Sequence, residues 1–203
     1  APITETLASA LLMLTPWKKD RILVDPFCGS GTFPIEAAMM AADMAPGLNR
    51  HFLAESWEHL IPKECWEDAR EEARERVNLD IETDIQGFDI DAAAIKAARA
   101  NAKMAGVVSE LRHSKPFGFI VTNPPYGERI EEKSNLPALY REIGESYKGL
   151  DRWSMYLITA YDKAENDIGR KADKNRKIYN GMMKTYYYQF LGPRPPKKGS
   201  IKE

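Results

Sequence analysis

Short apolar runs alternate with amphipathic helical patterns along most of this 203-residue chain. The apolar runs have the length of buried strands and occupy residues 21–27, 85–90, 117–122 and 153–161. Between them, apolar residues recur at intervals of three and four, which predicts helices. Alternation of this kind predicts an α/β fold with a mostly parallel sheet and helices on both faces.

Each predicted helix has an apolar face and a recognisable start or stop. Leu7, Leu11 and Leu14 form the first face, which ends before Pro16, and Pro34 and Pro62 are expected to open the next two helices. Asp91 can cap a further helix, and Gly106 can end it. The residues expected to face the core in the later helices are Ile35, Ala38, Met39 and Ala42; Trp66, Ala69, Ala73 and Val77; Ile95, Ala98, Ala102 and Ala105; and Leu136, Leu139, Tyr140, Ile143 and Tyr147.

The chain is expected to form a single domain over residues 1–203. Within it we expect an opening helix in residues 1–16 and a helical insertion in residues 43–84. The aromatic run at residues 184–191 predicts an antiparallel C-terminal hairpin, and the proline-rich residues 192–203 predict an irregular tail. The acidic outer face of the Pro62 helix is expected to be solvated.

Composition excludes several classes of protein. Apolar residues make up 43% of the chain, but no apolar run approaches the roughly 18 residues of a membrane span, and no signal pattern opens the chain. Cys28 and Cys65 cannot build a disulfide framework, and the three histidines share no metal-ligand spacing. We therefore expect a cytoplasmic protein without a bound metal, and its oligomeric state stays open.

The net charge of −1 conceals an uneven distribution. Residues 1–162 carry a net charge of −8, and residues 163–203 carry +7. Among the basic residues of this second part are Arg170, Lys171, Lys174, Arg176 and Lys177. This end could contact nucleic-acid phosphates, or it could be a solvated loop.

A glycine-containing loop follows the first predicted strand and precedes a helix. It reads Asp25-Pro26-Phe27-Cys28-Gly29-Ser30-Gly31-Thr32. Gly29 and Gly31 allow a sharp turn and the close approach of a ligand to the backbone. The loop lacks the Gly-Lys-Thr of a phosphate-binding P-loop, and the three-glycine dinucleotide fingerprint is also absent. Because an unpaired buried carboxylate is costly, Asp25 suggests a ligand with a cationic or amine group.

A second carboxylate, Asp89, follows the second strand and is placed to accept hydrogen bonds from ribose hydroxyls. Asp89 lies more residues after the glycine loop than is usual for a carboxylate in this role. A helical insertion must therefore occupy the gap, and residues 43–84 supply it.

A rigid turn, Asn123-Pro124-Pro125-Tyr126, follows the strand at 117–122. The two prolines fix the backbone and leave carbonyl acceptors, Asn123 adds a side-chain acceptor, and Tyr126 adds an aromatic face. These groups suit a flat, nitrogen-rich substrate with an exocyclic amine.

The motifs DPFCGSGT, GFDID and TNPPYGERI, in this order, resemble those of S-adenosylmethionine-dependent amino-methyltransferases of the Rossmann-like class. This resemblance implies the Rossmann-like fold of a class I methyltransferase. More narrowly, the chain resembles bacterial RNA methylases that carry an N-terminal THUMP RNA-binding domain and are often labelled adenine-specific DNA methylases. APITETLASALL, KNRKIYNG and YYYQFLGPRPP extend the resemblance over essentially the whole chain.

The resemblance implies a role for each motif. The methionine end of S-adenosylmethionine would be held by Asp25, Gly29 and Gly31. These three residues belong to the cofactor-binding loop that also contains Pro26, Cys28, Ser30 and Thr32. Asp89 would bind the ribose, and Ile90 would pack on the adenine. Asn123 and the Pro124 carbonyl would accept hydrogen bonds from the target amine, next to Pro125, and Tyr126 would stack on the flipped base. Asn123 would also border the cofactor.

Two departures from the family pattern lead to further expectations. Because the sequence starts directly at the opening helix, we expect a methyltransferase fragment from which the N-terminal RNA-binding domain is absent. A third strand is expected after Gly106, but the segment VVSELRHSKP is too short for it. We therefore expect that residues are missing between positions 107 and 109, where a residue contacting the cofactor adenine would lie.

The resemblance favours an RNA methyltransferase acting on the 2-amino group of guanine, most simply in ribosomal RNA. Nothing in the Asn-Pro-Pro-Tyr turn separates guanine from adenine, so an adenine N6-methyltransferase acting on DNA is the alternative. A non-catalytic cofactor- or RNA-binding module is a third possibility, but such a module has no need of the amine-acceptor turn.

Overall fold

A six-stranded mixed sheet forms the centre of the protein in a computed structural model, which describes residues 3–107, 116–126, 134–150 and 152–196. The strands are β1 (Leu23–Asp25), β2 (Ile85–Gly87), β3 (Phe119–Thr122), β4 (Ser154–Thr159), β5 (Lys174–Asn180) and β6 (Met183–Phe190), in the order β2-β1-β3-β4-β6-β5. The first four strands are parallel, and β6 runs antiparallel to both β4 and β5. The predicted fold class and C-terminal hairpin are therefore confirmed.

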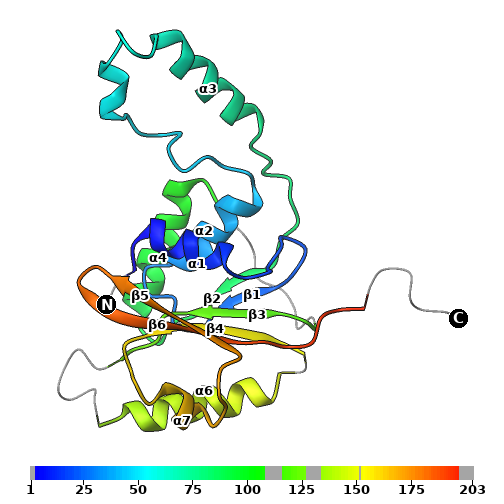
Figure 1. Cartoon of the computed structure of the whole chain (residues 1–203). Coiled ribbons are helices and arrows are strands. Elements are labelled where there is room, and N and C mark those ends of the chain that lie inside the picture. The colour runs from blue at the N-terminus through cyan, green and yellow to red at the C-terminus, as the bar shows by residue number, and fades with distance from the viewer. Residues whose placement is uncertain (1–2, 108–115, 127–133, 151, 197–203) are drawn as a thin grey trace, which may run out of the picture.

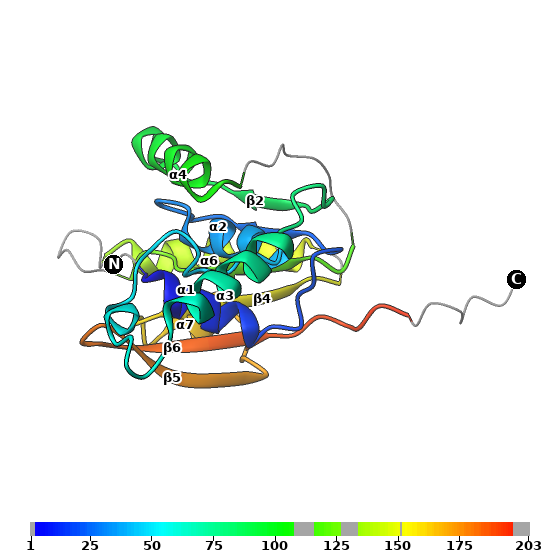
Figure 2. The ribbon, with the colours of Figure 1, turned by 90° about the horizontal axis from the view of Figure 1, so that it is seen from above.

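Helices cover both faces of the sheet, as Figure 1 shows. One face carries α1 (Glu5–Met13), α2 (Thr32–Ala41) and α4 (Ala92–Ala105), and the other carries α6 (Leu136–Lys148) and α7 (Ala164–Ile168). The central strand β4 is buried along its full length and contributes to two cores, with Tyr156 and Ile158 on one face and Met155 and Leu157 on the other. Seen from above in Figure 2, β2 and α4 lie at one edge of the sheet and β5 lies at the other.

Helix α2 starts two residues earlier than predicted. Gly31 adopts a left-handed conformation (φ 87°) as its N-cap, so the helix begins directly at Thr32 rather than at Pro34. The buried face is correspondingly different, since Phe33, Glu36, Ala37 and Ala41 face inward while Ile35, Ala38 and Met39 are only half-buried. The buried Glu36 accepts a hydrogen bond from the Ser9 hydroxyl of α1, which a pattern of apolar residues does not reveal.

The predicted ends of α4 are confirmed. The Asp91 carboxylate accepts a hydrogen bond from the Ala93 N–H at 2.8 Å, and Gly106 ends the helix with φ 76°. The face expected to pack inward, at Ile95, Ala98, Ala102 and Ala105, is half-buried rather than fully buried. This partial burial is consistent with the position of α4 at the edge of the sheet (Figure 2).

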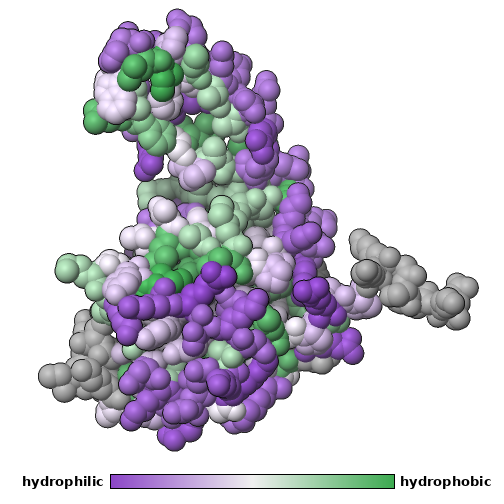
Figure 3. Space-filling view, viewed as in Figure 1, coloured by the Kyte–Doolittle hydropathy of each residue, from purple (hydrophilic) through white to green (hydrophobic). Residues whose placement is uncertain are grey.

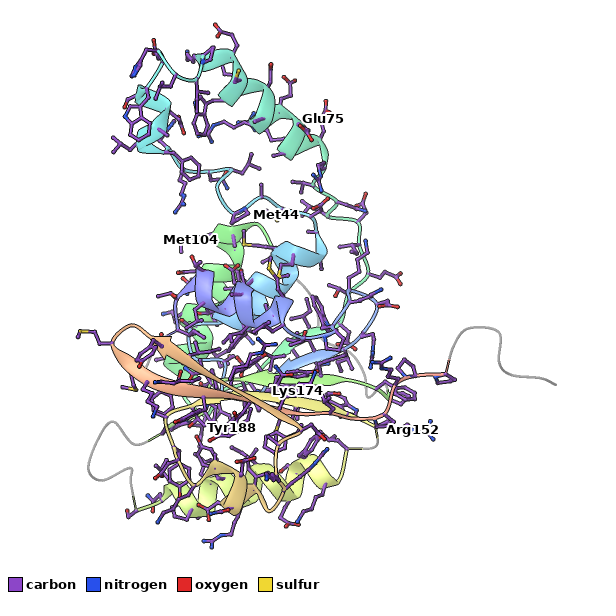
Figure 4. All side chains as sticks on the ribbon, in the orientation of Figure 1. Met44, Glu75, Met104, Arg152, Lys174 and Tyr188 are labelled. Atoms are coloured by element: carbon purple, nitrogen blue, oxygen red, sulfur yellow. The ribbon has the colours of Figure 1, made fainter. Side chains whose placement is uncertain are left out.

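The insertion forms an arm that projects from the body of the protein (Figure 1). We define the arm as residues 43–77, which contain the 3₁₀ helix η1 (Leu53–Ser56) and α3 (Lys63–Glu75). The arm closes at its foot, where the Asn78 N–H donates to the Ala42 carbonyl at 2.9 Å. Figure 4 places Met44, at this foot, near the end of α4 that carries Met104, while Glu75 lies at the last residue of α3.

The face of α3 predicted to point inward does not pack on the sheet. No residue of α3 is buried, and Ala69 is exposed, while Trp66, Ala73 and Val77 are half-buried. Trp66 instead stacks on Phe52 of the arm itself, with ring centroids 6.0 Å apart. The prediction of a buried face was therefore wrong, because the helix packs only within the arm.

The residues of two elements were not identified from the sequence, namely those of β5, the outer strand of the predicted hairpin, and those of α7. The sequence of β5, KNRKIYN, is mostly polar because it forms an exposed edge of the sheet, and α7 has only five residues. Residues 192–196 form neither helix nor strand, and the rest of the predicted tail lies outside the described residues. The junction at 107–109, where we expected missing residues, falls largely outside the described residues.

Over the described ranges, no helix is both long and apolar enough to cross a membrane. The same part of the chain contains no cluster of three or more histidine, cysteine or acidic side chains that could hold a metal ion.

Candidate active site

The predicted site residues all follow the carboxyl ends of parallel strands. Asp25 is the last residue of β1, Asp89 follows β2, and Asn123 follows β3 directly. Because these strands run in the same direction, their carboxyl ends lie at one edge of the sheet, where open α/β folds bind ligands. The structure therefore brings the glycine loop (residues 25–32), Asp89 with Ile90, and the turn 123–126 to a common edge.

Asp25 is buried beneath this edge, with 2% of its surface exposed. Its Oδ1 accepts hydrogen bonds from the Thr122 hydroxyl at 2.6 Å and from the Phe27 N–H at 3.1 Å. Burial raises the pKa of the Asp25 carboxyl to about 7, and the nearby Asp89 charge adds to this effect, while the two hydrogen bonds oppose it. A buried carboxylate of this kind is poised to gain from a cationic ligand.

The glycine loop is fixed to the second strand by backbone hydrogen bonds. The Phe88 N–H donates to the Asp25 carbonyl, and the Cys28 N–H donates to the Phe88 carbonyl, both at 2.8 Å. Gly31 requires its left-handed φ and also lacks room for a side chain, since a Cβ there would lie 3.0 Å from the Ala98 Cβ of α4. The loop is thereby held against both β2 and α4 in front of the α2 N-terminus.

Cys28 has no catalytic role in this arrangement. Its side chain is 7% exposed, and burial raises the pKa of the thiol to about 11, so that it stays protonated at neutral pH.

Asp89 connects the loop to a cavity beside α4. Its Oδ2 accepts a hydrogen bond from the Gly29 N–H and its Oδ1 accepts one from the Asp91 N–H, each at 2.9 Å. The cavity measures about 440 Å³ and is lined by Asp89, Ile90, Ala92, Ile95, Lys96 and Arg99. Ile90 is fully exposed, although it is a large apolar side chain. A carboxylate next to an exposed apolar side chain fits the two halves of a nucleoside, the ribose and the base.

The turn after β3 is supported from beneath by a tyrosine of α6. The Tyr140 hydroxyl donates to the Pro125 carbonyl at 3.2 Å and also bonds the Thr159 hydroxyl at the end of β4. Pro124 is buried, Asn123 is half-buried, and Pro125 is exposed. The sequence showed Tyr140 only as a core residue, although a buried tyrosine hydroxyl generally requires a polar partner.

Tyr126 is 8% exposed, so its ring presents little surface to the solvent in this conformation. Stacking of Tyr126 on a target base would require the ring to turn outward, and this role stays a prediction.

Residues 1–189 match the model of the family UPF0020, described as RMKL-like, methyltransferase domain. The chain belongs to this family. Its family membership confirms the resemblance inferred from the motifs.

Three individual proteins are similar to this chain over nearly its whole length. "Putative RNA methyltransferase YpsC" of Bacillus subtilis is 46% identical over 209 residues, covering 98% of this chain and 54% of that protein. "Ribosomal RNA large subunit methyltransferase K/L" of Shewanella woodyi is 38% identical, covering 90% of this chain and 28% of that protein. The crystal structure of SMU.472, described as a putative methyltransferase complexed with SAH, is 41% identical with a TM-score of 0.87, covering 96% of this chain and 54% of that one.

The chain thus spans about half the length of YpsC and of SMU.472, and less of the K/L protein.

Proposed function

We propose that this chain is the catalytic part of an S-adenosylmethionine-dependent RNA methyltransferase that modifies the 2-amino group of guanine in ribosomal RNA. The observation that carries the proposal is the hydrogen bond between Thr122 and Asp25. It joins the glycine loop to the strand end that leads directly into Asn123, so that a ligand-binding loop and an amine-acceptor turn form one unit. The names of the relatives support RNA, and in part ribosomal RNA, as the substrate.

The residues present fit S-adenosylmethionine. The buried Asp25 can accept a hydrogen bond from the ammonium group of the methionine end, while Gly29 and Gly31 allow the backbone to approach it closely. Asp89 can accept from the ribose hydroxyls, and the exposed Ile90 can cover the adenine. When bound, the cofactor supplies an electrophilic methyl group on a sulfonium.

The turn 123–126 positions the nucleophile. The Asn123 side chain and the Pro124 carbonyl can accept the two hydrogen bonds of an exocyclic amine, which aligns the nitrogen lone pair with the methyl group for in-line transfer. Tyr140 fixes this turn through the Pro125 carbonyl. As the carbon–nitrogen bond forms and the carbon–sulfur bond breaks, the nitrogen becomes cationic and then loses a proton to water, so no strong base is needed.

Transfer of labelled methyl groups tests the proposal. Unmodified ribosomal RNA, transfer RNA and DNA are incubated with the protein and labelled S-adenosylmethionine, and the nucleosides are then separated. We expect label in guanosine methylated at the 2-amino group, from ribosomal RNA only. Label in N6-methyladenine from DNA would support the alternative function instead.

Asn123→Ala should abolish transfer, with a loss of at least about 100-fold, because the amine loses an acceptor in the transition state. Binding of S-adenosylhomocysteine, measured by calorimetry, should stay within about twofold of wild type. Asn166→Ala is the matched control, since this exposed asparagine lies on α7. Unchanged turnover in Asn123→Ala would contradict the role of the turn.

A further inference from the structure

The β5–β6 hairpin is a basic surface without a single acidic residue. Residues 174–190 contain four cationic side chains, Lys174, Arg176, Lys177 and Lys184, and no aspartate or glutamate. All four are exposed, and none of them forms an ion pair within the described part of the chain. Figure 3 shows hydrophilic side chains gathered over this front edge of the sheet. The positive charge of the hairpin is therefore available to a partner.

Lysines and tyrosines alternate on one face of this hairpin. Lys177 pairs with Tyr186 across the two strands, and Tyr179 pairs with Lys184 in the next row on the same face. The Lys177 Nζ lies 5.3 Å from the Tyr179 ring centroid, and the Lys184 Nζ lies 5.2 Å from the Tyr186 ring centroid. Tyr179 is 55% exposed. We call these four residues the Lys–Tyr face.

The other two cations point to the opposite side of the hairpin. In a strand, alternate residues face opposite ways, so Lys174 and Arg176 lie on the face of the sheet that carries α1 and α2. Figure 4 shows Lys174 near the start of β5, away from the hairpin tip. The hairpin thus provides a comparison within itself. Lys177 and Lys184 each lie within 5.3 Å of the centroid of a solvent-accessible tyrosine ring, whereas Arg176 pairs with the fully buried Tyr187 and Lys174 pairs with Gln189.

The Lys–Tyr face extends past the catalytic edge. By this term we mean the edge of the sheet formed by the carboxyl ends of the parallel strands, where the predicted site residues lie. Tyr186 pairs with Thr159, the last residue of β4, so the next row, Tyr179 and Lys184, lies roughly 7 Å beyond the strand end. The turn 123–126 follows β3, which is separated from β6 only by β4, at a lateral distance on the order of 10 Å. A polynucleotide whose target base enters the turn can therefore reach the hairpin with a neighbouring nucleotide.

We propose that the Lys–Tyr face binds single-stranded RNA next to the target nucleotide, with Lys177 and Lys184 on phosphates and the exposed Tyr179 ring against a base. Alternating cations and aromatic rings are how proteins hold single strands without reading their sequence. An acidic peptide would use the lysines but would have no need of the rings. The proposal rests on the proposed function, because it names the part of the surface that holds the RNA substrate.

Binding of a fluorescent unstructured RNA 20-mer, measured by anisotropy over a series of salt concentrations, tests this proposal. The Lys177→Ala/Lys184→Ala variant should bind at least about tenfold more weakly, and the salt slope should fall by about 1.4, since each phosphate on a single strand contributes about 0.7. Lys174→Ala/Arg176→Ala is the charge-matched control and should lose less than about threefold. Tyr179→Ala should weaken binding by about 5-fold to 150-fold, and Tyr179→Phe should restore it.

Equal losses of RNA affinity in the two double variants would indicate diffuse electrostatic attraction and would overturn the proposal. RNA binding by the wild type that none of the variants weakens would also overturn it. Absence of RNA binding by the wild-type protein would overturn it as well. Displacement of the RNA by polyglutamate of equal charge would show a general polyanion site and count against the role of the ring. S-adenosylhomocysteine binding, measured in parallel, reports on the proposed function separately, because none of these residues belongs to the catalytic edge.

Discussion

Asp25 is a buried carboxyl at the catalytic edge, and its burial is the largest cause of its raised pKa. Its carboxyl has a pKa of about 7 in the folded protein, against 3.8 for an unperturbed carboxyl. Between these two values the folded state retains a proton that the unfolded state has lost. The stability that this proton contributes to the folded state is therefore fully present below about pH 4 and is lost as the pH rises to 7. Above about pH 7 this carboxyl causes no further change in the free energy of unfolding.

Asp25→Asn should remove this dependence. The variant carries no buried charge, so its free energy of unfolding at pH 8 should exceed that of wild type by on the order of 2 kcal/mol, while S-adenosylhomocysteine should bind at least about tenfold more weakly. Urea unfolding between pH 4.5 and 8.5 and calorimetric titration measure the two effects. Asp80→Asn, at an exposed carboxylate, is the control. A wild-type stability that is flat over this range would contradict the buried-charge explanation.

The residues that the sequence could not reveal are those whose role depends on a tertiary partner. The glycine loop, Asp89 and Asn123 could be placed at one edge, because parallel strands bring their carboxyl ends together. Glu36 could not be placed in the interior, because its partner Ser9 lies on another helix. The support that Tyr140 gives to the Pro125 carbonyl likewise depends on how α6 packs on the sheet.

At the scale of elements, the arm is a self-contained unit held by Arg70. The Arg70 guanidinium donates to the carbonyls of Leu48 and Arg50, at 3.0 and 2.8 Å, and to the Glu55 carboxylate. Glu55 also bonds His51 and the Phe52 N–H, and the His51 hydrogen bond is the largest cause of the pKa of about 2 at Glu55. These contacts explain how a helix without a buried residue stays in place.

Removal of the arm should leave the body folded. Because the Ala42 carbonyl and the Asn78 N–H are bonded, two glycines can replace residues 43–77 without separating the strands. We expect a cooperative thermal transition within about 3 °C of wild type, which corresponds to about 1 kcal/mol for a domain of this size, and unchanged binding of S-adenosylhomocysteine. Circular dichroism and calorimetry measure these quantities. Arg70→Ala, which loosens the arm without shortening the chain, is the control. Failure of the shortened body to fold would show that the arm is part of the core.

The reasons that β5 and α3 were misjudged are different. β5 forms the outer edge of the sheet and contributes little to either core, so no apolar alternation marks it. The pattern of α3 is a genuine amphipathic pattern, but its apolar side packs on Phe52 rather than on the sheet. Periodicity predicts that a helix has an apolar face and does not identify the surface against which this face packs.

At the scale of the whole molecule, burial is complete along β3 and β4, whereas neither α3 nor α4 contains a buried residue. Every residue of β4 is buried between the two cores, and no residue of α3 is buried. Native-state hydrogen exchange should follow this gradient, since local opening requires little energy where few apolar contacts must break. The slowest amides should be those of β4 and exchange only by global unfolding, while those of α3 should exchange at least about 100-fold faster.

Mass spectrometry of peptic fragments measures this gradient, and the amides of α6, which bury Leu136, Tyr140 and Tyr147, provide an internal reference of similar helix length. Protection of α3 equal to that of α6 would contradict the independence of the arm.

The closed foot of the arm also bears on how the chain folds. Strands β1 and β2 are adjacent in the sheet but about 60 residues apart in sequence, and the contact between Ala42 and Asn78 removes roughly 35 residues from the intervening loop. Since loop closure costs about 0.6 kcal/mol for each doubling of loop length, an arm that forms early lowers the entropic barrier to β1–β2 pairing by roughly that amount or slightly more. If the arm closes before the sheet forms, the insertion thus shortens the conformational search, because it brings two distant segments of the chain together ahead of the sheet that joins them.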